Sequence, residues 1–203
     1  MIYKDFQGLK LSQLGFGTMR LPLREDKSID EELAAAMTAE AIAKGVNYFD
    51  TAWPYHSGKS ETVIGKILKQ YPRESFYLAD KFPGHQIAPN YDVKAVFEKQ
   101  LKKCGVEYFD FYLLHNLGEA RTEYFDKFDM WNWVAEKKAA GLIKHVGFSF
   151  HSTPEELEAI LKEHPEMEFV QLQINYADWE NPAIQSRGCY EVARKYGKPV
   201  IIM

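Results

Sequence analysis

Short apolar segments alternate with segments of helical spacing along almost the whole chain, and this order limits the folds that the chain can adopt. The expected strands cover residues 14–19, 46–50, 76–81, 109–114, 145–149, 169–174 and 199–203. The expected helices cover residues 31–44, 60–69, 93–104, 125–140 and 182–196, and one more begins at Thr153-Pro154. Strands joined in this way by helices predict right-handed crossovers in a parallel sheet.

Two parallel folds satisfy this order, a (β/α)8 barrel and a doubly wound sheet. The strands are short, about five residues each, which favours the barrel. No G-x-G-x-x-G segment follows the first strand, which weighs against a dinucleotide-binding Rossmann domain. We therefore expect an α/β fold of the (β/α)8 TIM-barrel type, a single domain over residues 1–203 with about seven strands and six helices. A hairpin over residues 2–10, turning at Gln7-Gly8, is expected to precede it.

Three of the expected helices begin at residues that commonly cap helices. Asp30 precedes helix 31–44, and Ser60 stands at the start of helix 60–69. Oxygen-bearing side chains at these positions accept hydrogen bonds from the first unpaired backbone N–H groups of a helix. Thr153 precedes Pro154, and proline is favoured at the first helical position. We expect all three residues to cap.

The composition excludes several classes of protein. The chain has 203 residues, 46% of them hydrophobic, and a formal net charge of −4, so no basic field attracts nucleic acid or an anionic membrane. No apolar run has the length of a membrane span, and the N-terminus lacks the apolar core of a signal peptide. Cys104 and Cys189 lack the spacing of metal ligands, so we expect no metal site and a cytoplasmic protein with free thiols rather than a disulfide.

The segment YFDTAWPYHSGKSE, residues 48–61, holds the first pair of chemically useful residues. It begins as an apolar strand that ends at Asp50 and continues through a turn marked by Pro54 and Gly58. Tyr55 lies in that turn, five positions after Asp50. A carboxylate at the end of a strand with a loop tyrosine close behind it is an unusual arrangement for packing alone.

Further polar residues stand at the C-terminal ends of later strands. Lys81 ends the third strand, His115 follows the fourth, Ser149 ends the fifth and Gln173 lies on the sixth. In a parallel barrel these strand ends form one face, and barrel enzymes place their catalytic groups there. We expect these side chains to lie near the carboxylate and the tyrosine of the first segment.

Tyr55 is the expected proton donor of this group. A tyrosine has an unperturbed pKa near 10, and a close ammonium lowers that pKa. Lys81 is expected to supply the ammonium, Asp50 to hold it, and His115 to bind the substrate oxygen or share its proton. Such a site protonates a carbonyl oxygen as negative charge builds on it, and the accompanying hydride has to come from a cofactor such as a nicotinamide.

Each of these residues also has a structural interpretation. Asp50 is equally well explained as a turn cap, and Tyr55 alone is more often a packing residue. Lys81 after an apolar strand is commonly a solvated charge, and His115 is more often a strand-end histidine with a structural hydrogen bond. The catalytic interpretation depends on all four residues standing at successive strand ends.

Several motifs resemble those of the aldo-keto reductases. The opening strand and the segment around the aspartate and tyrosine resemble that family's, as do the lysine closing the third strand and the histidine after the fourth. The motifs, in order, are GFGTM at 15–19, NYFDTA at 47–52 with Tyr55 and Ser60-Glu61, Lys81, DFYLLH at 110–115, GFS at 147–149 and QINY at 173–176. The resemblance covers the whole chain and is strongest to a bacterial branch whose longer members carry a C-terminal iron–sulfur module. This chain has no such cysteine cluster, so that cofactor is not expected.

The resemblance implies an NADP(H)-dependent reduction of a small aldehyde or ketone. It assigns catalysis to Asp50, Tyr55, Lys81 and His115, and nicotinamide binding to Asp50, Ser149 and Gln173. The family's barrel has eight strands, and its main contacts to the adenosine phosphate follow the seventh and eighth. We expect the 203-residue chain, as an apparently truncated form, to bind NADPH weakly and to self-associate through open barrel edges.

Two other functions fit the same sequence. A barrel without turnover would bind a nucleotide or a protein partner, as the channel-associated subunits of the family do. A lyase or isomerase would use Lys81 as a Schiff base. For the reductase, the aromatic residues Trp53, Phe82 and Trp179 suggest a pocket for an apolar or aromatic carbonyl.

Overall fold

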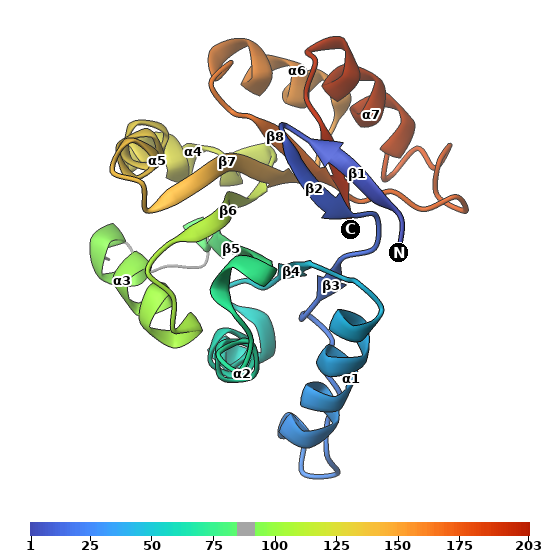
Figure 1. The fold of residues 1–203 in the computed structure, drawn as a ribbon. Coiled ribbons are helices and arrows are strands. Elements are labelled where there is room, and N and C mark those ends of the chain that lie inside the picture. The colour runs from blue at the N-terminus through green and yellow to red at the C-terminus, as the bar shows by residue number, and fades with distance from the viewer. Residues whose placement is uncertain (85–91) are drawn as a thin grey trace. The chain divides into compact units, whose positions relative to one another are not determined.

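The computed structural model describes residues 1–84 and 92–203 of the chain (Figure 1). The N-terminal hairpin is formed by β1 (Tyr3–Phe6) and β2 (Leu9–Ser12), which pair antiparallel. Gln7 and Gly8 form its turn with φ angles of 53° and 87°, a left-handed backbone that glycine adopts at little cost. The predicted hairpin and its turn are confirmed.

Seven further strands form one sheet in the order β3-β4-β5-β6-β7-β8-β9, which is also their order in the chain. These strands are β3 (Phe16–Gly17), β4 (Tyr48–Asp50), β5 (Tyr77–Phe82), β6 (Phe109–Leu117), β7 (Ile143–Phe150), β8 (Phe169–Leu172) and β9 (Val200–Ile202). The helices are α1 (Glu31–Ala43), α2 (Ser60–Leu68), α3 (Val93–Cys104), α4 (Glu123–Lys127), α5 (Met130–Ala139), α6 (Pro154–Glu163) and α7 (Ser186–Lys195). The predicted alternation of parallel strands and helices is confirmed.

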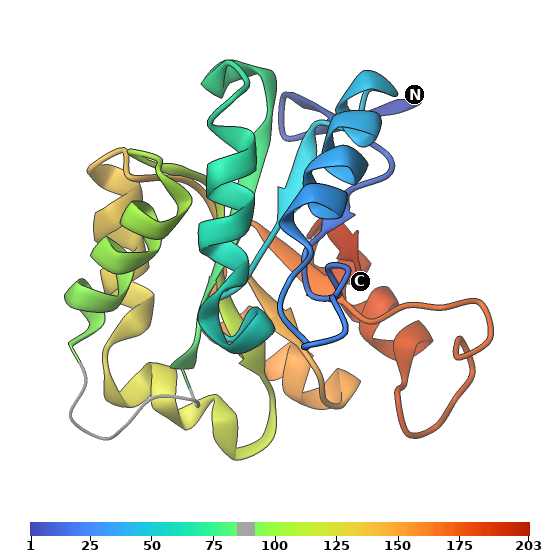
Figure 2. The same ribbon diagram turned by 90° about the horizontal axis from the view of Figure 1, so that it is seen from below.

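The described residues form two compact units. The first contains residues 1–81 and 92–111, with strands β3 and β4, most of β5, and helices α1 to α3. Its parallel strands pair Phe16 with Phe49 and Phe49 with Leu78. Figure 2 shows α1 and α2 side by side, and the buried side chains beneath them form one apolar cluster. That cluster contains Leu21, Ile29, Ala34, Val63 and Ile67.

Helices α2 and α3 of the first unit approach each other at Gly65. A Cβ atom on Gly65 would lie 2.5 Å from the backbone oxygen of Cys104, closer than any side chain tolerates. The absence of a side chain therefore sets the distance between these two helices. This approach brings the first turn of α2 and the last turn of α3 together.

The second unit contains residues 82–84 and 112–203, with β7 to β9 and α4 to α7. Its parallel strands pair Phe148 with Val170 and Val170 with Val200. Gly147 lies against Phe169, whose backbone oxygen would be 2.5 Å from an added Cβ. The core of this unit includes the buried side chains Phe148, Phe169, Leu157 and Leu161.

Four local predictions were wrong in detail. The expected helix 125–140 is two helices, because Asp129 has a φ of 50° between α4 and α5. The first strand covers two residues rather than six, since Leu14 and Met19 are exposed. The helix expected from residue 182 begins at Ser186. Ser60 does not cap α2: its buried hydroxyl bonds the hydroxyls of Thr51 and Thr18 at 3.0 and 2.7 Å.

Two of the three predicted caps are confirmed. The Asp30 carboxylate accepts from the backbone N–H of Leu33 at 3.0 Å, and the Thr153 hydroxyl accepts from Glu156 at 3.3 Å. Both thiols are free and buried. None of the helices within residues 1–84 and 92–203 is long and apolar enough to cross a membrane.

Candidate active site

The structure brings Asp50, Tyr55 and Lys81 together within the first unit. β4 ends at Asp50, which pairs with Ala79 of β5 two residues before Lys81. The Lys81 ammonium forms an ion pair with the Asp50 carboxylate and donates to the backbone oxygen of Thr51 at 2.8 Å. It also donates to the Tyr55 hydroxyl at 3.2 Å. The Lys81 side chain is 1% exposed, so these oxygens take the place of water around its charge.

The turn that carries Tyr55 has an uncommon backbone. Within η1 (Tyr55–Gly58), His56 and Ser57 have φ angles of 52° and 54°, and Gly58 follows at 81°. Residues other than glycine occupy this left-handed region at a cost of roughly 1–3 kcal/mol each, and such strain clusters at functional sites. The backbone N–H of Leu21 donates to His56 Nε2 at 2.9 Å, which holds one side of the turn.

The pKa of Tyr55 differs from the sequence-based expectation. Burial raises the pKa of the phenol, the Lys81 ammonium lowers it, and the Asp50 carboxylate raises it again, with a net result above the usual value of 10. The expected lowering by Lys81 is therefore present but smaller than the effect of burial. At neutral pH the hydroxyl keeps its proton, which suits a proton donor.

Lys81 remains an ammonium despite its burial. Burial lowers the pKa of this amine. Asp50 and Tyr55 together raise that pKa by a larger amount, so the net pKa lies above its usual value. The side-chain amide of Gln100 donates to the backbone oxygen of Lys81 at 3.0 Å and fixes the strand end. The expectation of a solvated Lys81 does not hold.

The other three predicted residues lie in the second unit. His115 is half-buried on β6. Ser149, on β7, is 1% exposed, and its hydroxyl accepts from the backbone N–H of Asn116 at 2.7 Å. Gln173 follows directly after β8, rather than lying on it, and is exposed.

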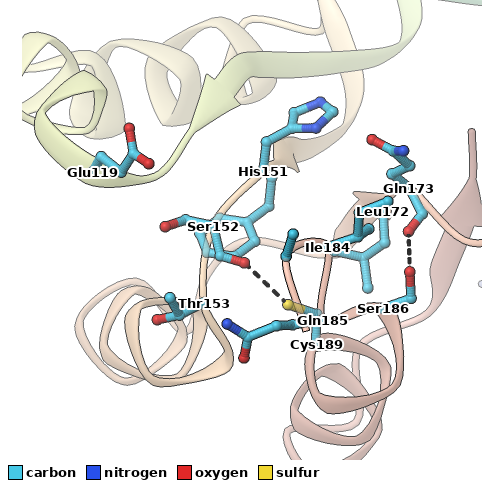
Figure 3. Close-up of a pocket in the computed structure, with 12 residues that line it drawn as sticks. Glu119, His151, Ser152, Thr153, Leu172, Gln173, Ile184, Gln185, Ser186 and Cys189 are labelled. Carbon is cyan, nitrogen blue, oxygen red and sulfur yellow. Dashed lines mark hydrogen bonds between the residues drawn. The ribbon is translucent and has the colours of Figure 1, made fainter. Parts of the chain in front are cut away.

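A pocket of about 200 Å³ lies in the second unit, next to Gln173 (Figure 3). His151, Ser152 and Cys189 line it with Gln173 and Ser186. Ser186 donates to the backbone oxygen of Gln173 at 2.8 Å, and the Cys189 thiol donates to that of Ser152 at 3.4 Å. Burial raises the pKa of that thiol to about 11, so Cys189 is not a nucleophile at neutral pH.

Two of the aromatic residues expected around the substrate contact other residues of their own units. Phe82 is fully buried, with ring centroids 6.4 Å from Phe125 and 5.9 Å from Trp133. Trp53 lies under the Lys103 ammonium, 4.2 Å from ring centroid to nitrogen. A fully buried Phe82 contributes to the core, which weakens the expectation of a pocket shaped by these aromatic residues.

Two buried acids near the site were not among the predicted site residues. Asp80 and Glu61 are both fully buried in the first unit. The signal for Asp80 was its place inside the apolar strand that ends at Lys81, where a carboxylate has no solvated face. Glu61, in the first turn of α2, belongs to the Ser60-Glu61 motif of the family resemblance, but nothing in the sequence indicated that its carboxyl group is buried.

The profile of the aldo/keto reductase family matches residues 13–203. The chain belongs to this family. It is 31% identical over 182 residues to a probable aldo-keto reductase of Glycine max, covering 85% of this chain and 50% of that protein. It is 27% identical over 126 residues to an NADH-specific methylglyoxal reductase of Escherichia coli, covering 53% of this chain and 39% of that protein.

Solved structures of the family share the fold. A thermostable aldo-keto reductase in complex with the inhibitor epalrestat superposes with a TM-score of 0.76 at 25% identity, covering 100% of this chain and 72% of that one. This similarity confirms the predicted TIM-barrel fold class. The chain spans about half the length of the curated aldo/keto reductase relatives it matches.

Proposed function

We propose that the protein reduces an aldehyde or ketone by hydride transfer from NADPH, with Tyr55 as the general acid. The observation that carries this proposal is the 3.2 Å hydrogen bond from the buried Lys81 ammonium to the Tyr55 hydroxyl. Membership of an oxidoreductase family supports the reaction class. The match covers half the length of the first of these relatives, and the proposal is made for the protein at its native length.

In this mechanism Tyr55 gives its proton to the carbonyl oxygen as negative charge builds there. The tyrosinate that remains is stabilised by the Lys81 ammonium, which Asp50 holds in place. A fixed charge in a site of low dielectric needs no reorganisation at the moment of reaction. The raised pKa of the free phenol ensures that the proton is present before the substrate arrives.

The second unit offers groups that fit a nicotinamide carboxamide. The Ser149 hydroxyl accepts one hydrogen bond and retains its own proton to donate, and Gln173 carries an exposed primary amide. A bound nicotinamide supplies the hydride. We propose Ser149 and Gln173, with Asp50, as its protein contacts. His115 is our proposed hydrogen-bond donor to the carbonyl oxygen, on the strength of the family resemblance.

Two observations concern the Schiff-base alternative and the choice between NADPH and NADH. A Schiff base needs a neutral amine, and the pKa of Lys81 lies above its usual value because of Asp50 and Tyr55, despite its burial. One relative is named an NADH-specific reductase, so NADH is the alternative hydride donor that the test has to include.

The test is nicotinamide oxidation by purified native-length protein, with NADPH and NADH offered separately against a series of aldehydes and ketones. Borohydride trapping on Lys81 runs in parallel. We expect carbonyl-dependent oxidation of NADPH and no trapped adduct. Tight nucleotide binding without turnover of any carbonyl would favour the non-catalytic barrel, and a trapped adduct would favour the Schiff-base chemistry.

A further inference from the structure

A cluster of titratable side chains joins α2, α3 and β5 in the first unit. Glu61 comes from α2, Asp80 from β5, and Lys103 and Cys104 from α3. Both carboxyl groups are fully buried. Two carboxylates cannot both stay ionised in such surroundings without a large free-energy cost.

Lys103 connects this group to the turn that carries Tyr55. Its ammonium donates to Glu61 Oε2 at 2.6 Å and to the backbone oxygen of Gly58 at 2.9 Å. The same nitrogen lies 4.2 Å from the Trp53 ring centroid, in cation–π geometry. Lys103 therefore holds the end of the turn opposite to the bond between Leu21 and His56.

The second oxygen of Glu61 identifies where a proton belongs. Glu61 Oε1 is buried and has no hydrogen-bond donor among the residues that the structure describes, when all carboxyl groups are taken as ionised. Asp80 Oδ1 accepts from the backbone N–H of Lys81 at 2.8 Å, and the Cys104 thiol lies 3.9 Å from Oδ2. Burial, and then the charge of Glu61, raise the pKa of Asp80 well above its usual value.

We propose that Asp80 keeps its proton at neutral pH and donates it to Glu61 Oε1, so that the pair carries one negative charge, which fixes Lys103 and through it the Tyr55 turn. Asp80 and Glu61 are then positioning residues. The groups that interact with Asp80 are Glu61 from α2, Cys104 from α3, Lys81 on its own strand and Tyr55 from the turn after β4.

A neutral Asp80 also keeps a second negative charge away from Tyr55 and Lys81. An ionised Asp80 would raise the pKa of Tyr55, as Asp50 already does. It would also compete with Asp50 for the Lys81 ammonium. Keeping the proton on Asp80 leaves that ammonium to Asp50 and to the tyrosinate formed in the reaction. This consequence depends on the proposed function, whereas the shared proton does not.

Infrared spectroscopy of the purified protein tests the shared proton without any activity. A protonated carboxyl group has a C=O stretching band that carboxylates lack and that shifts in D₂O. We expect this band in the wild type at neutral pH, its loss in Asp80→Asn, and its retention in Asp110→Asn. Asp110 is the matched control because it is a buried aspartate whose carboxylate is paired with Arg73.

The wild-type spectrum can overturn the proposal even if the Asp80 variant does not fold. No protonated carboxyl band in the wild type would overturn the proposal. A band that persists in folded Asp80→Asn and disappears in Glu61→Gln would place the proton on Glu61 and overturn it as well.

The positioning role is tested by kinetics of the native-length enzyme. Lys103→Met should lower kcat by about 10- to 100-fold through displacement of Tyr55, with a shifted pH profile and little change in KM for the nucleotide. Lys103→Arg, which keeps a donor to both partners, should recover most of the loss. Lys102→Met, on the same helix and exposed, is the control.

Wild-type kcat and pH profile in Lys103→Met would overturn the positioning role. An inactive wild type that shows the carboxyl band would overturn the proposed function and leave the shared proton standing.

Discussion

The Lys81 ammonium lies 3.2 Å from the Tyr55 hydroxyl and donates a hydrogen bond to it, while the lysine side chain is 1% exposed. A charge buried at this distance acts on the phenol with little screening by water. The same ammonium is held by the Asp50 carboxylate and the Thr51 backbone oxygen. Asp50 and Tyr55 raise the pKa of Lys81, and Lys81 in turn lowers the pKa of Tyr55 against the larger effect of burial.

Removal of the lysine charge should slow the reaction more than it weakens nucleotide binding. Lys81→Met leaves Tyr55 buried without the ammonium that stabilises its anion, so we expect kcat to fall by roughly 10²–10³-fold. The Kd for NADPH should change little. Steady-state kinetics and fluorescence titration measure the two quantities, with Lys102→Met as the control. Undiminished kcat in Lys81→Met would mean that the ammonium does not act on the proton donor.

The shared proton predicts an unusual pH dependence of stability. Asp80 has a raised pKa in the folded protein, so its favourable contribution is complete below the unfolded pKa near 4 and is lost as the pH rises toward the folded pKa. Unfolding then releases one proton, and wild-type stability falls by about 1.4 kcal/mol per pH unit from this group. Asp80→Asn has no such proton.

Urea unfolding of both proteins between about pH 5 and 7 checks this dependence. We expect the stability of Asp80→Asn to rise relative to the wild type across the range. Parallel pH profiles for the two proteins would mean that Asp80 ionises in the folded state as it does in the unfolded chain.

The close approach of α2 and α3 predicts a reversal of the usual effect of a helical Gly→Ala substitution. Such a change ordinarily stabilises a helix by roughly 0.5–1 kcal/mol. At Gly65 the added methyl would lie 2.5 Å from the backbone of Cys104, so we expect a loss of about 1–3 kcal/mol. Gly17→Ala, with no atom within 4 Å of the added Cβ, is the control in chemical denaturation. Equal stability of the two variants would show that the helices can separate freely.

The partly buried ion pair of Arg73 should contribute more than a surface pair. Arg73 donates to Asp110 Oδ2 at 2.6 Å and to the backbone oxygens of Tyr108 and Phe76 at 3.1 Å each. Arg73→Ala leaves the Asp110 carboxylate, 10% exposed, without its countercharge, so we expect a loss of roughly 3 kcal/mol. Lys66→Ala, which breaks an exposed pair with Glu31, should cost at most about 1 kcal/mol. Losses of similar size in the two variants would contradict this assignment.

The parts of the molecule that the sequence predicted are those that local patterns determine. The Asp30 cap and the turn at Gln7-Gly8 depend on residues a few positions apart, and both were predicted. The meeting of Asp50 and Lys81 was predicted because neighbouring parallel strands bring their C-terminal ends together.

The remaining features depend on packing between distant segments. Glu61 and Lys103 are 42 positions apart, and their contact requires the close approach that Gly65 permits. The burial of the Ser60 hydroxyl, which turns an expected cap into a partner of Thr51, arises in the same way. The direction of the Tyr55 pKa shift was wrong because burial, which no local pattern reports, has the largest effect on it.

The role of Tyr55 as proton donor is tested most directly by the single-turnover rate of NADPH oxidation at saturating carbonyl, compared between the native-length wild type and Tyr55→Phe. Tyr71→Phe, a half-buried tyrosine just beyond α2, is the control. We expect Tyr55→Phe to be slower by roughly 10²–10⁴-fold with an unchanged Kd for NADPH. An equal rate in the wild type and Tyr55→Phe would show that another group donates the proton.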